Sequence, residues 1–398
     1  MNGLIVADVA IAGGGIIGLS LGLELRRRGL SVVVVERQKA MSSASWAAGG
    51  MLAVHDPQNP AELLPLSLRS WELYPAYLER IEELSGLKVP LRTRRAMQYV
   101  EPARGDGGRY GDPVTAAEIA EFAPGLDTGS HQFEWLDEGS LDPNDVREAL
   151  PPAFLAAGGT LLEETEMLSV QSGANGVEVE TTRQRISAGM FVNCRGAWSG
   201  ETAGKAERGL ERLPVAPVKG QMGNLRCEPE RLRCVVRAPG IYLVPRGDGR
   251  VTIGATIEHV GFDETVQESQ VRQMAEAALR LLPEAEAPAQ MDMWAGLRPG
   301  TPDTLPILGR AEKDRCWHAT GHYRDGILLA PVTAHVMTQA MLGETTDVGL
   351  EAFPPGVSER GATTGSGRGL SRSGLGIVSG WSRDCQGFAG IVAGPVAY

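Results

Sequence analysis

The first forty residues contain the feature that most restricts how this chain can fold. A short apolar run, Val9 to Ala12, leads directly into Gly13, Gly15 and Gly18, and these glycines open an apolar helical pattern. A second apolar run then ends at Glu36. The order strand, glycine-rich turn, helix, strand and acidic residue is typical of a dinucleotide-binding βαβ unit. A plain glycine-rich turn is the alternative, but the complete order of elements favours dinucleotide binding.

Each residue type in this pattern has a physical task. The first glycine permits the tight turn, the second lets the backbone approach a pyrophosphate, and the third lets the helix pack closely on the strand. The helix N-terminus adds unpaired N–H groups and a partial positive charge for the phosphates. The Glu36 carboxylate can accept hydrogen bonds from both ribose hydroxyls. It would repel a 2′-phosphate, which disfavours NADP.

Composition argues against several other functions. The 398 residues carry a net charge of −11, whereas a nucleic-acid-binding surface needs a basic excess. The five cysteines form no CxxC pair, which suits a reducing cytosol better than a disulfide framework. The N-terminal apolar run is broken by Asp8 and three glycines, so we expect a strand and a cytoplasmic protein, without a signal peptide or membrane span. The six histidines show no HExxH or clustered spacing, so no metal site is expected.

The rest of the chain predicts an α/β fold with an inserted antiparallel sheet. Helices are expected over residues 63–84, where Pro75 interrupts the pattern, and after Asp142, which is a good N-cap. Residues 191–199 form a strand that ends in a turn of small residues and returns the chain to the parallel sheet. Residues 215–255 alternate like antiparallel strands. The pattern therefore predicts a Rossmann-like dinucleotide-binding domain with an inserted substrate-binding domain.

The C-terminal third completes the first domain. Residues 294–309 hold prolines and glycines that oppose regular structure, so we expect a loop of fixed shape, and an apolar helix begins at Ile327. Residues 356–398 are rich in glycine and serine without any helical or strand period, which predicts a disordered tail. The two expected domains are discontinuous: 1–85, 140–213 and 294–353 for the dinucleotide-binding domain, and 86–139 and 214–293 for the substrate-binding domain.

Five segments, in the same order along residues 1–353, carry a resemblance to a known family. They are GGGIIG with the later Glu36–Arg37, ASWAAGGML, VNCRGAWS, GLRPGTPDTLPILG and GHYRDGILLAPVTA. Together they resemble the FAD-dependent amino acid oxidases of the D-amino acid oxidase group, and the last two are most similar to its glycine oxidase branch, which serves the thiamine pathway. The resemblance implies FAD rather than NAD. It also implies oxidative deamination of glycine and small amines such as sarcosine or D-alanine, with reduction of O2 to H2O2.

The resemblance also implies positions for both ligands. Arg298 would bind the substrate carboxylate with its planar fork of N–H donors. Arg324 and Tyr242 would support it, and Met51 would line a small apolar pocket. No side-chain base is implied, because the flavin N5 takes the hydride from the substrate Cα. The implied FAD contacts are Gly13, Gly15, Ile16, Ile17, Gly18, Glu36, Arg37, Ala44, Ser45, Gly49, Gly50, Met51, Met167, His322, Tyr323, Arg324, Asp325, Gly326, Ile327 and Leu328.

Several alternatives stay open from sequence. Arg298 could instead form a structural salt bridge, and Tyr242 could be a core tyrosine. The enzyme could be a D-amino acid dehydrogenase or oxidase of another specificity, or the chain could bind FAD without catalysis. The GLRPGTPD segment has no cysteine and the GATIEHV segment no lysine, in contrast to the sarcosine oxidase relatives, so we expect non-covalent FAD. By resemblance the partners would be a small amino acid, O2, a downstream thiazole synthase and further copies of the chain in a tetramer.

Overall fold

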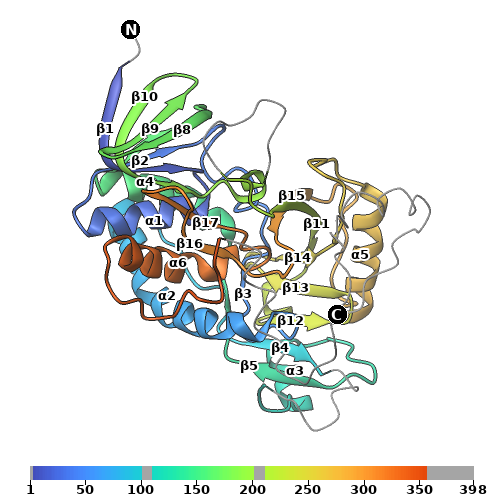
Figure 1. Ribbon diagram of the computed structural model, residues 1–398. Coiled ribbons are helices and arrows are strands. Elements are labelled where there is room, and N and C mark those ends of the chain that lie inside the picture. Colours follow the sequence, from blue (N-terminus) through green and yellow to red (C-terminus); the bar gives the residue numbers. More distant parts are fainter. Residues whose placement is uncertain (1–2, 101–109, 201–210, 356–398) are drawn as a thin grey trace, which may run out of the picture.

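The computed structural model describes residues 3–100, 110–200 and 211–355, and two β-sheets carry the fold (Figure 1). The tail that the sequence predicts to be disordered, residues 356–398, lies outside the described residues. The strands of the first sheet are β1 (Leu4–Ala12), β2 (Val32–Val35), β7 (Thr160–Leu162), β8 (Met167–Gly173), β9 (Gly176–Thr181), β10 (Arg185–Asn193), β16 (Ile307–Arg310) and β17 (Cys316–Thr320).

The centre of the first sheet is parallel, as predicted. Its main path is β16-β17-β10-β1-β2-β7, and β8 and β9 extend from β10. On β1, Val9 and Ile11 pack in the cluster shared with the helices, whereas Ala10 and Ala12 pack with residues of β8, β9 and β10 on the other face. Because both faces are covered, the strand is a continuous apolar run rather than an alternating one.

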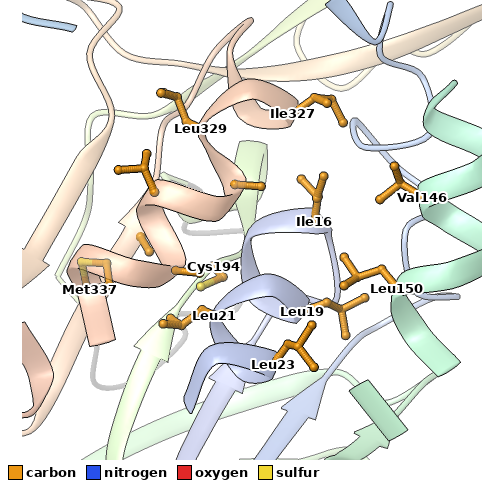
Figure 2. Close-up of a cluster of buried hydrophobic side chains, with 14 of the residues drawn as sticks. Ile16, Leu19, Leu21, Leu23, Val146, Leu150, Cys194, Ile327, Leu329 and Met337 are labelled. Atoms are coloured by element: carbon orange, nitrogen blue, oxygen red, sulfur yellow. The ribbon is translucent and has the colours of Figure 1, made fainter. Parts of the chain in front are cut away.

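Four helices pack beside the first sheet: α1 (Ile16–Arg27), α2 (Leu64–Ser85), α4 (Pro143–Ala156) and α6 (Gly326–Met341). Figure 2 shows the core between three of them, where Leu19 of α1 lies near Leu150 of α4 and Leu21 lies on the side of α6. Helix α6 is buried along almost its whole length. This burial explains why α6 is apolar all round, because a surface helix would show one polar face.

The second sheet follows the order β15-β11-β14-β13-β12-β4-β5. One face packs on α5 (Glu268–Leu281), where Val271, Ala275 and Ala278 meet strand residues such as Leu243 and Ile253. A short helix, α3 (Ala116–Phe122), lies next to β5 in Figure 1. The strands are β4 (Ala96–Tyr99), β5 (Phe133–Leu136), β11 (Ala216–Arg226), β12 (Val235–Ala238), β13 (Ile241–Pro245), β14 (Arg250–Gly254) and β15 (Met293–Gly300).

The expectation of a loop over residues 294–309 is wrong. Most of this segment is strand: β15 pairs with β11 along its whole length, and β16 pairs with β17. Strand β15 lies at the edge of its sheet, where a residue without an N–H group is tolerated. Pro299 uses this position and stands opposite Pro217 of β11.

The expected interruption at Pro75 is also wrong, because α2 continues through it. A proline inside a helix costs about 3 kcal/mol. The buried face of α2 offsets this cost: Tyr74, Leu78 and Ile81 lie in the core, and the Tyr74 hydroxyl donates to the Ile327 carbonyl of α6 at 2.5 Å. Packing on α6 therefore keeps α2 helical through Pro75.

The division into two discontinuous domains remains our proposal. Strand β15 belongs to the second sheet, so the last segment of the dinucleotide-binding domain begins after Gly300 rather than at residue 294. A two-stranded ribbon of β3 (Met51–Leu52) and β6 (Gly139–Ser140) lies where the chain passes between the proposed domains.

We predict a large loss of stability from Phe154→Ala in α4. Phe154 is fully buried, and its ring packs directly on Gly22 and Gly159, which have no side chains to move into the space that truncation would leave. Truncation should cost about 3–5 kcal/mol, measured by urea unfolding of the full chain. Leu155→Ala is the matched control, because Leu155 follows Phe154 in α4 but is 50% exposed. Equal losses in the two variants would contradict this account of the core.

Candidate active site

The glycine-rich turn between β1 and α1 is shaped by two close backbone approaches. Gly13 has φ = +109°, and a Cβ there would lie 2.3 Å from the Cys194 carbonyl oxygen. A Cβ on Gly18 would lie 2.0 Å from the Gly13 carbonyl oxygen, so the third glycine permits helix–strand packing, as predicted. The nearest atom to a Cβ on Gly15 would be Ser45 Oγ, at 3.2 Å. The absence of a side chain at Gly15 therefore leaves space in the cavity and is not needed for packing against another part of the protein.

Glu36 is held at the end of β2 in an orientation that suits a ribose. Its Oε2 accepts a hydrogen bond from the Gly14 N–H at 2.8 Å, and its Oε1 accepts one from the Gln38 N–H at 2.9 Å. Each carboxylate oxygen keeps a second lone pair for a further donor. The carboxylate lines the same cavity as the glycine turn, as a dinucleotide site requires.

This cavity runs from the glycine turn to the second sheet and brings the predicted site together. Every predicted FAD-contacting residue except Gly18 and Leu328 lines it, and so do the predicted substrate residues Arg298 and Tyr242. Leu328 instead lies in the core, where its carbonyl accepts a hydrogen bond from Ser70 Oγ at 2.5 Å. Residues more than 300 positions apart in the chain thus line one cavity.

The turn after β10 also lines the cavity, although the sequence analysis did not assign it to the site. It contributes Cys194, Arg195 and the short helix η2 (Gly196–Ser199). The signal was available, because β10 is parallel to β1 and the carboxyl ends of parallel neighbours meet at one sheet edge. Trp198 of this turn lies under the Arg37 guanidinium, with the carbon 3.8 Å from the ring centre. Burial raises the pKa of the Cys194 thiol, so it is not a reactive thiolate.

Arg298 of β15 has the environment of an anion-binding side chain. Its Nη1 donates to the Thr256 carbonyl at 3.0 Å and, at 3.4 Å, to the Lys219 carbonyl. Its guanidinium lies against the backbone of Gly220, where a Cβ would come within 2.1 Å of Nη2. Within residues 3–100, 110–200 and 211–355 no carboxylate forms an ion pair with Arg298, so the structural salt bridge considered from sequence is not found there.

Tyr242 of β13 lies in the same cavity and is buried. Its hydroxyl donates to the Met222 sulfur at 3.1 Å, which is a weak acceptor. Burial raises the pKa of Tyr242, and the nearby guanidinium of Arg298 opposes the shift. The hydroxyl therefore keeps its proton and can be redirected to a carboxylate.

Arg324 lines the cavity but is held by the segment after β3. Its guanidinium donates to the side chains of Gln58 at 2.5 Å and Asn59 at 3.1 Å, and Asp56 lies 3.4 Å away. A charge that is already paired binds a second anion less strongly. The structure thus distinguishes the two arginines that the sequence analysis grouped as substrate residues.

The N-terminus of α6 forms another part of the cavity wall. Gly326 and Ile327 line the cavity, and the first turn carries no side-chain cap, so its N–H groups and the helix dipole favour negative charge there. His322 just before it is buried and bonded to Thr333 at 3.0 Å, and burial lowers its pKa to about 3. Burial raises the pKa of Asp325 to about 7. His322 is therefore neutral, and Asp325 is easily neutralised.

Across residues 3–100, 110–200 and 211–355, no three His, Cys, Asp or Glu side chains lie close enough together to hold a metal ion. In the same part of the chain, none of the helices combines the length and apolarity that a bilayer span needs.

The geometry fits FAD, because the cavity offers a pyrophosphate turn, a ribose acceptor and an uncapped helix terminus, and the same cavity is lined by Arg298 and Tyr242. The model of the FAD dependent oxidoreductase family, DAO, matches residues 8–340. The chain belongs to this family, and the prediction of FAD is confirmed. The predicted fold class is confirmed as well.

Relatives of this chain include named oxidases. It is 33% identical to a glycine oxidase of Pseudomonas aeruginosa over 87% of this chain and 98% of the relative. It is 35% identical to the bifunctional protein ThiO/ThiG of Synechocystis over 88% of this chain, but it spans only 54% of that protein's length. The crystal structure of glycine oxidase from Geobacillus kaustophilus superposes with a TM-score of 0.80 at 32% identity, covering 89% of this chain and 99% of that one.

We predict that Gly15→Val yields folded but colourless protein. Gly15 lines the cavity, and a Cβ there would have only Ser45 Oγ within 4 Å, so we expect a valine to displace the cofactor and leave the fold intact. The ratio of flavin to protein absorbance after purification measures cofactor content. The variant should melt at the temperature of wild-type protein stripped of FAD. Yellow protein would show that the backbone at Gly15 does not approach the cofactor.

We predict that Asp325→Asn changes how stability depends on pH. The folded-state pKa near 7 lies above the ordinary value of 3.8, so the folded chain binds the proton more tightly than the unfolded chain does. The contribution of Asp325 to stability is thus greatest below about pH 4 and falls as pH rises to about 7. Wild-type protein should lose melting temperature relative to Asp325→Asn over this interval. If the melting temperatures of the two proteins change in parallel with pH, the pKa of Asp325 is not raised by burial.

Proposed function

We propose that this chain is an FAD-dependent oxidase of glycine and small amines or amino acids such as sarcosine and D-alanine. The products are the imino acid, which hydrolyses to the oxo acid, and H2O2 formed from O2. The observation that carries the proposal is the Arg298 guanidinium, which faces the flavin cavity beside the Tyr242 hydroxyl without a carboxylate partner in the described chain. The names of the relatives support glycine as the substrate.

The residues of the chain bind and orient the substrate. Arg298 takes the carboxylate, and the Thr256 carbonyl fixes the guanidinium at 3.0 Å. Tyr242 turns its hydroxyl from the Met222 sulfur to the same carboxylate. Met51 and Met222 line the pocket with apolar groups, which leaves little room for a substrate side chain.

When bound, FAD accepts the hydride from the substrate Cα and passes the electrons to O2. We assign no side-chain base. His322 lines the cavity, but its Nε2 is bonded to Thr333 and burial lowers its pKa to about 3, so it is a weak base. The substrate amine reacts in its neutral form, and its proton leaves to solvent. The uncapped N-terminus of α6 favours the negative charge that develops on reduction.

The product has a proposed destination. The bifunctional ThiO/ThiG relatives carry a second part that this chain does not span. We propose that the imine formed here feeds thiamine thiazole biosynthesis through a downstream thiazole synthase. The tetramer and the cytoplasmic location expected from sequence belong to this proposal too.

Two other functions give different results in one experiment. Anaerobic addition of glycine to purified protein should bleach the yellow flavin, and admission of O2 should return the colour with one H2O2 per turnover. Bleaching without peroxide on reoxidation by a quinone would indicate a D-amino acid dehydrogenase. No bleaching with glycine, sarcosine or D-alanine would indicate a non-catalytic FAD-binding protein. Acid precipitation should release intact FAD, whereas flavin retained on the chain would show a covalent link.

We predict that Arg298→Ala lowers kcat/KM for glycine by at least about ten- to hundredfold, because a charge-assisted hydrogen bond contributes about 1.5–3 kcal/mol. Arg298→Lys should recover little, since an ammonium restores the charge but not the planar fork. FAD content should persist in both variants. Steady-state peroxide production measures the effect.

Two controls sharpen this test. Arg310→Ala removes an exposed arginine that pairs with Asp314 outside the cavity, and it should leave kcat/KM unchanged. A simple secondary amine without a carboxylate should be oxidised equally poorly by wild type and Arg298→Ala. If Arg298→Ala oxidises glycine as well as wild type does, the carboxylate anchor lies elsewhere and the proposal loses its main support.

A further inference from the structure

A third arginine, Arg237 of β12, faces the cavity from the second sheet. In the antiparallel ladder of β12 and β13 it stands directly opposite Tyr242, and opposed residues project from the same face of a sheet. Both side chains line the flavin cavity. Arg237 is only 5% exposed, so its charge is removed from bulk water. No local sequence pattern distinguishes it from other arginines.

The guanidinium of Arg237 is only partly bonded. Its Nη2 donates to Glu138 Oε2 at 2.7 Å, and Glu138 is itself buried. Its Nε and Nη1 are buried and find no hydrogen-bond acceptor among the described residues. Buried N–H groups of a charged side chain are normally satisfied, so these two nitrogens can still donate to a partner that the described residues do not supply.

The neighbouring carboxylates are engaged elsewhere. Glu138 Oε1 accepts the His55 backbone N–H at 2.6 Å, which fixes the carboxylate on the side of Nη2. Asp56 lies 3.4 Å from Arg324 rather than at Arg237. Asp325 is buried close enough for Arg237 to affect its titration slightly, but no hydrogen bond joins the two. The free N–H groups of Arg237 are therefore left to a ligand.

We propose that Arg237 binds a second carboxylate on the substrate, so that the cavity accepts small amino acids with two carboxylates. Arg298 binds the α-carboxylate, and Arg237, on the same wall as Tyr242, binds the other. This inference rests on the proposed function, since it takes Arg298 as the first anchor. A guanidinium matches a carboxylate in shape and charge, and a site built to donate to a polar group discriminates against a substrate that lacks it.

The test compares two ligands that differ only in the second carboxylate. Oxydiacetate and methoxyacetate are ether acids without an amine, so the enzyme cannot oxidise them. Binding to the FAD-loaded full-length protein is followed by the change in the visible flavin spectrum. We expect wild type to bind oxydiacetate at least about tenfold more tightly than methoxyacetate, the size of one charge-assisted contact.

Two variants at the same ion pair should shift this preference in opposite directions. Arg237→Gln should abolish the preference for oxydiacetate. Glu138→Gln keeps an acceptor for Nη2 but removes the competing negative charge, so it should increase the preference. If Arg237→Gln does not fold, Glu138→Gln still tests the proposal alone. The corresponding substrate pair is sarcosine and N-(carboxymethyl)glycine, whose ratio of kcat/KM should follow the same order.

Several outcomes would overturn the inference. Equal affinity of wild type for both ligands would show that water or the flavin satisfies Arg237. A loss of FAD or an equal change for both ligands in Arg237→Gln would indicate a structural or cofactor role. Failure of the proposed function looks different: methoxyacetate would then bind equally to wild type and Arg298→Ala, whatever the response to Arg237.

Discussion

The site depends on one buried arginine that joins the second sheet to the segments before β3 and α4. Arg246, at the turn between β13 and β14, donates from Nη1 to the Leu141 carbonyl at 2.7 Å, from Nη2 to the Gly49 carbonyl at 3.0 Å, and from Nε to Thr252 at 2.9 Å. All three nitrogens are thus satisfied, which is the condition under which a buried charge is tolerated. Burial lowers the pKa of Arg246, and the carboxylate of Asp142 opposes that shift. One side chain thereby sets the distance between the flavin-contacting segment and the strand that carries Tyr242.

Much of this arrangement could be predicted from sequence where a local pattern has one physical meaning. The strand, the glycines and Glu36 are close in the chain, and each has a distinct task, so the dinucleotide turn was predictable residue by residue. The Asp142 side chain caps α4 at the Asn144 N–H, 3.0 Å away, as its position before a proline indicated. The grouping of Arg298 and Tyr242 came from family resemblance, because no local pattern places them in one cavity.

Other features could not be predicted from the local sequence, because they depend on contacts between residues far apart in the chain. Pro75 breaks a helical pattern in isolation, but α6 supplies enough buried contact to keep α2 continuous. Residues 294–300 contain a proline that a central strand would reject, and only the sheet order shows that β15 is an edge. The role that we propose for Arg237 could not be predicted from sequence for a similar reason. It depends on the pairing of Arg237 with Tyr242 across two strands and on the burial of Glu138, and no local sequence pattern indicates either.

The stack of Arg37, Trp198 and Phe262 has a thermodynamic consequence. Trp198 contacts both the Arg37 guanidinium and the Phe262 ring, whose centre is 5.6 Å from the centre of the Trp198 ring. Phe262 belongs to the loop after β14 that also contains Thr256, the residue whose carbonyl holds Arg298. The buried ammonium of Lys219 fastens the same loop by donating to the Thr265 carbonyl at 2.8 Å. If cofactor binding orders this loop, the free-energy cost of ordering it no longer opposes substrate binding. By reciprocity, the substrate must then tighten the cofactor by the same factor.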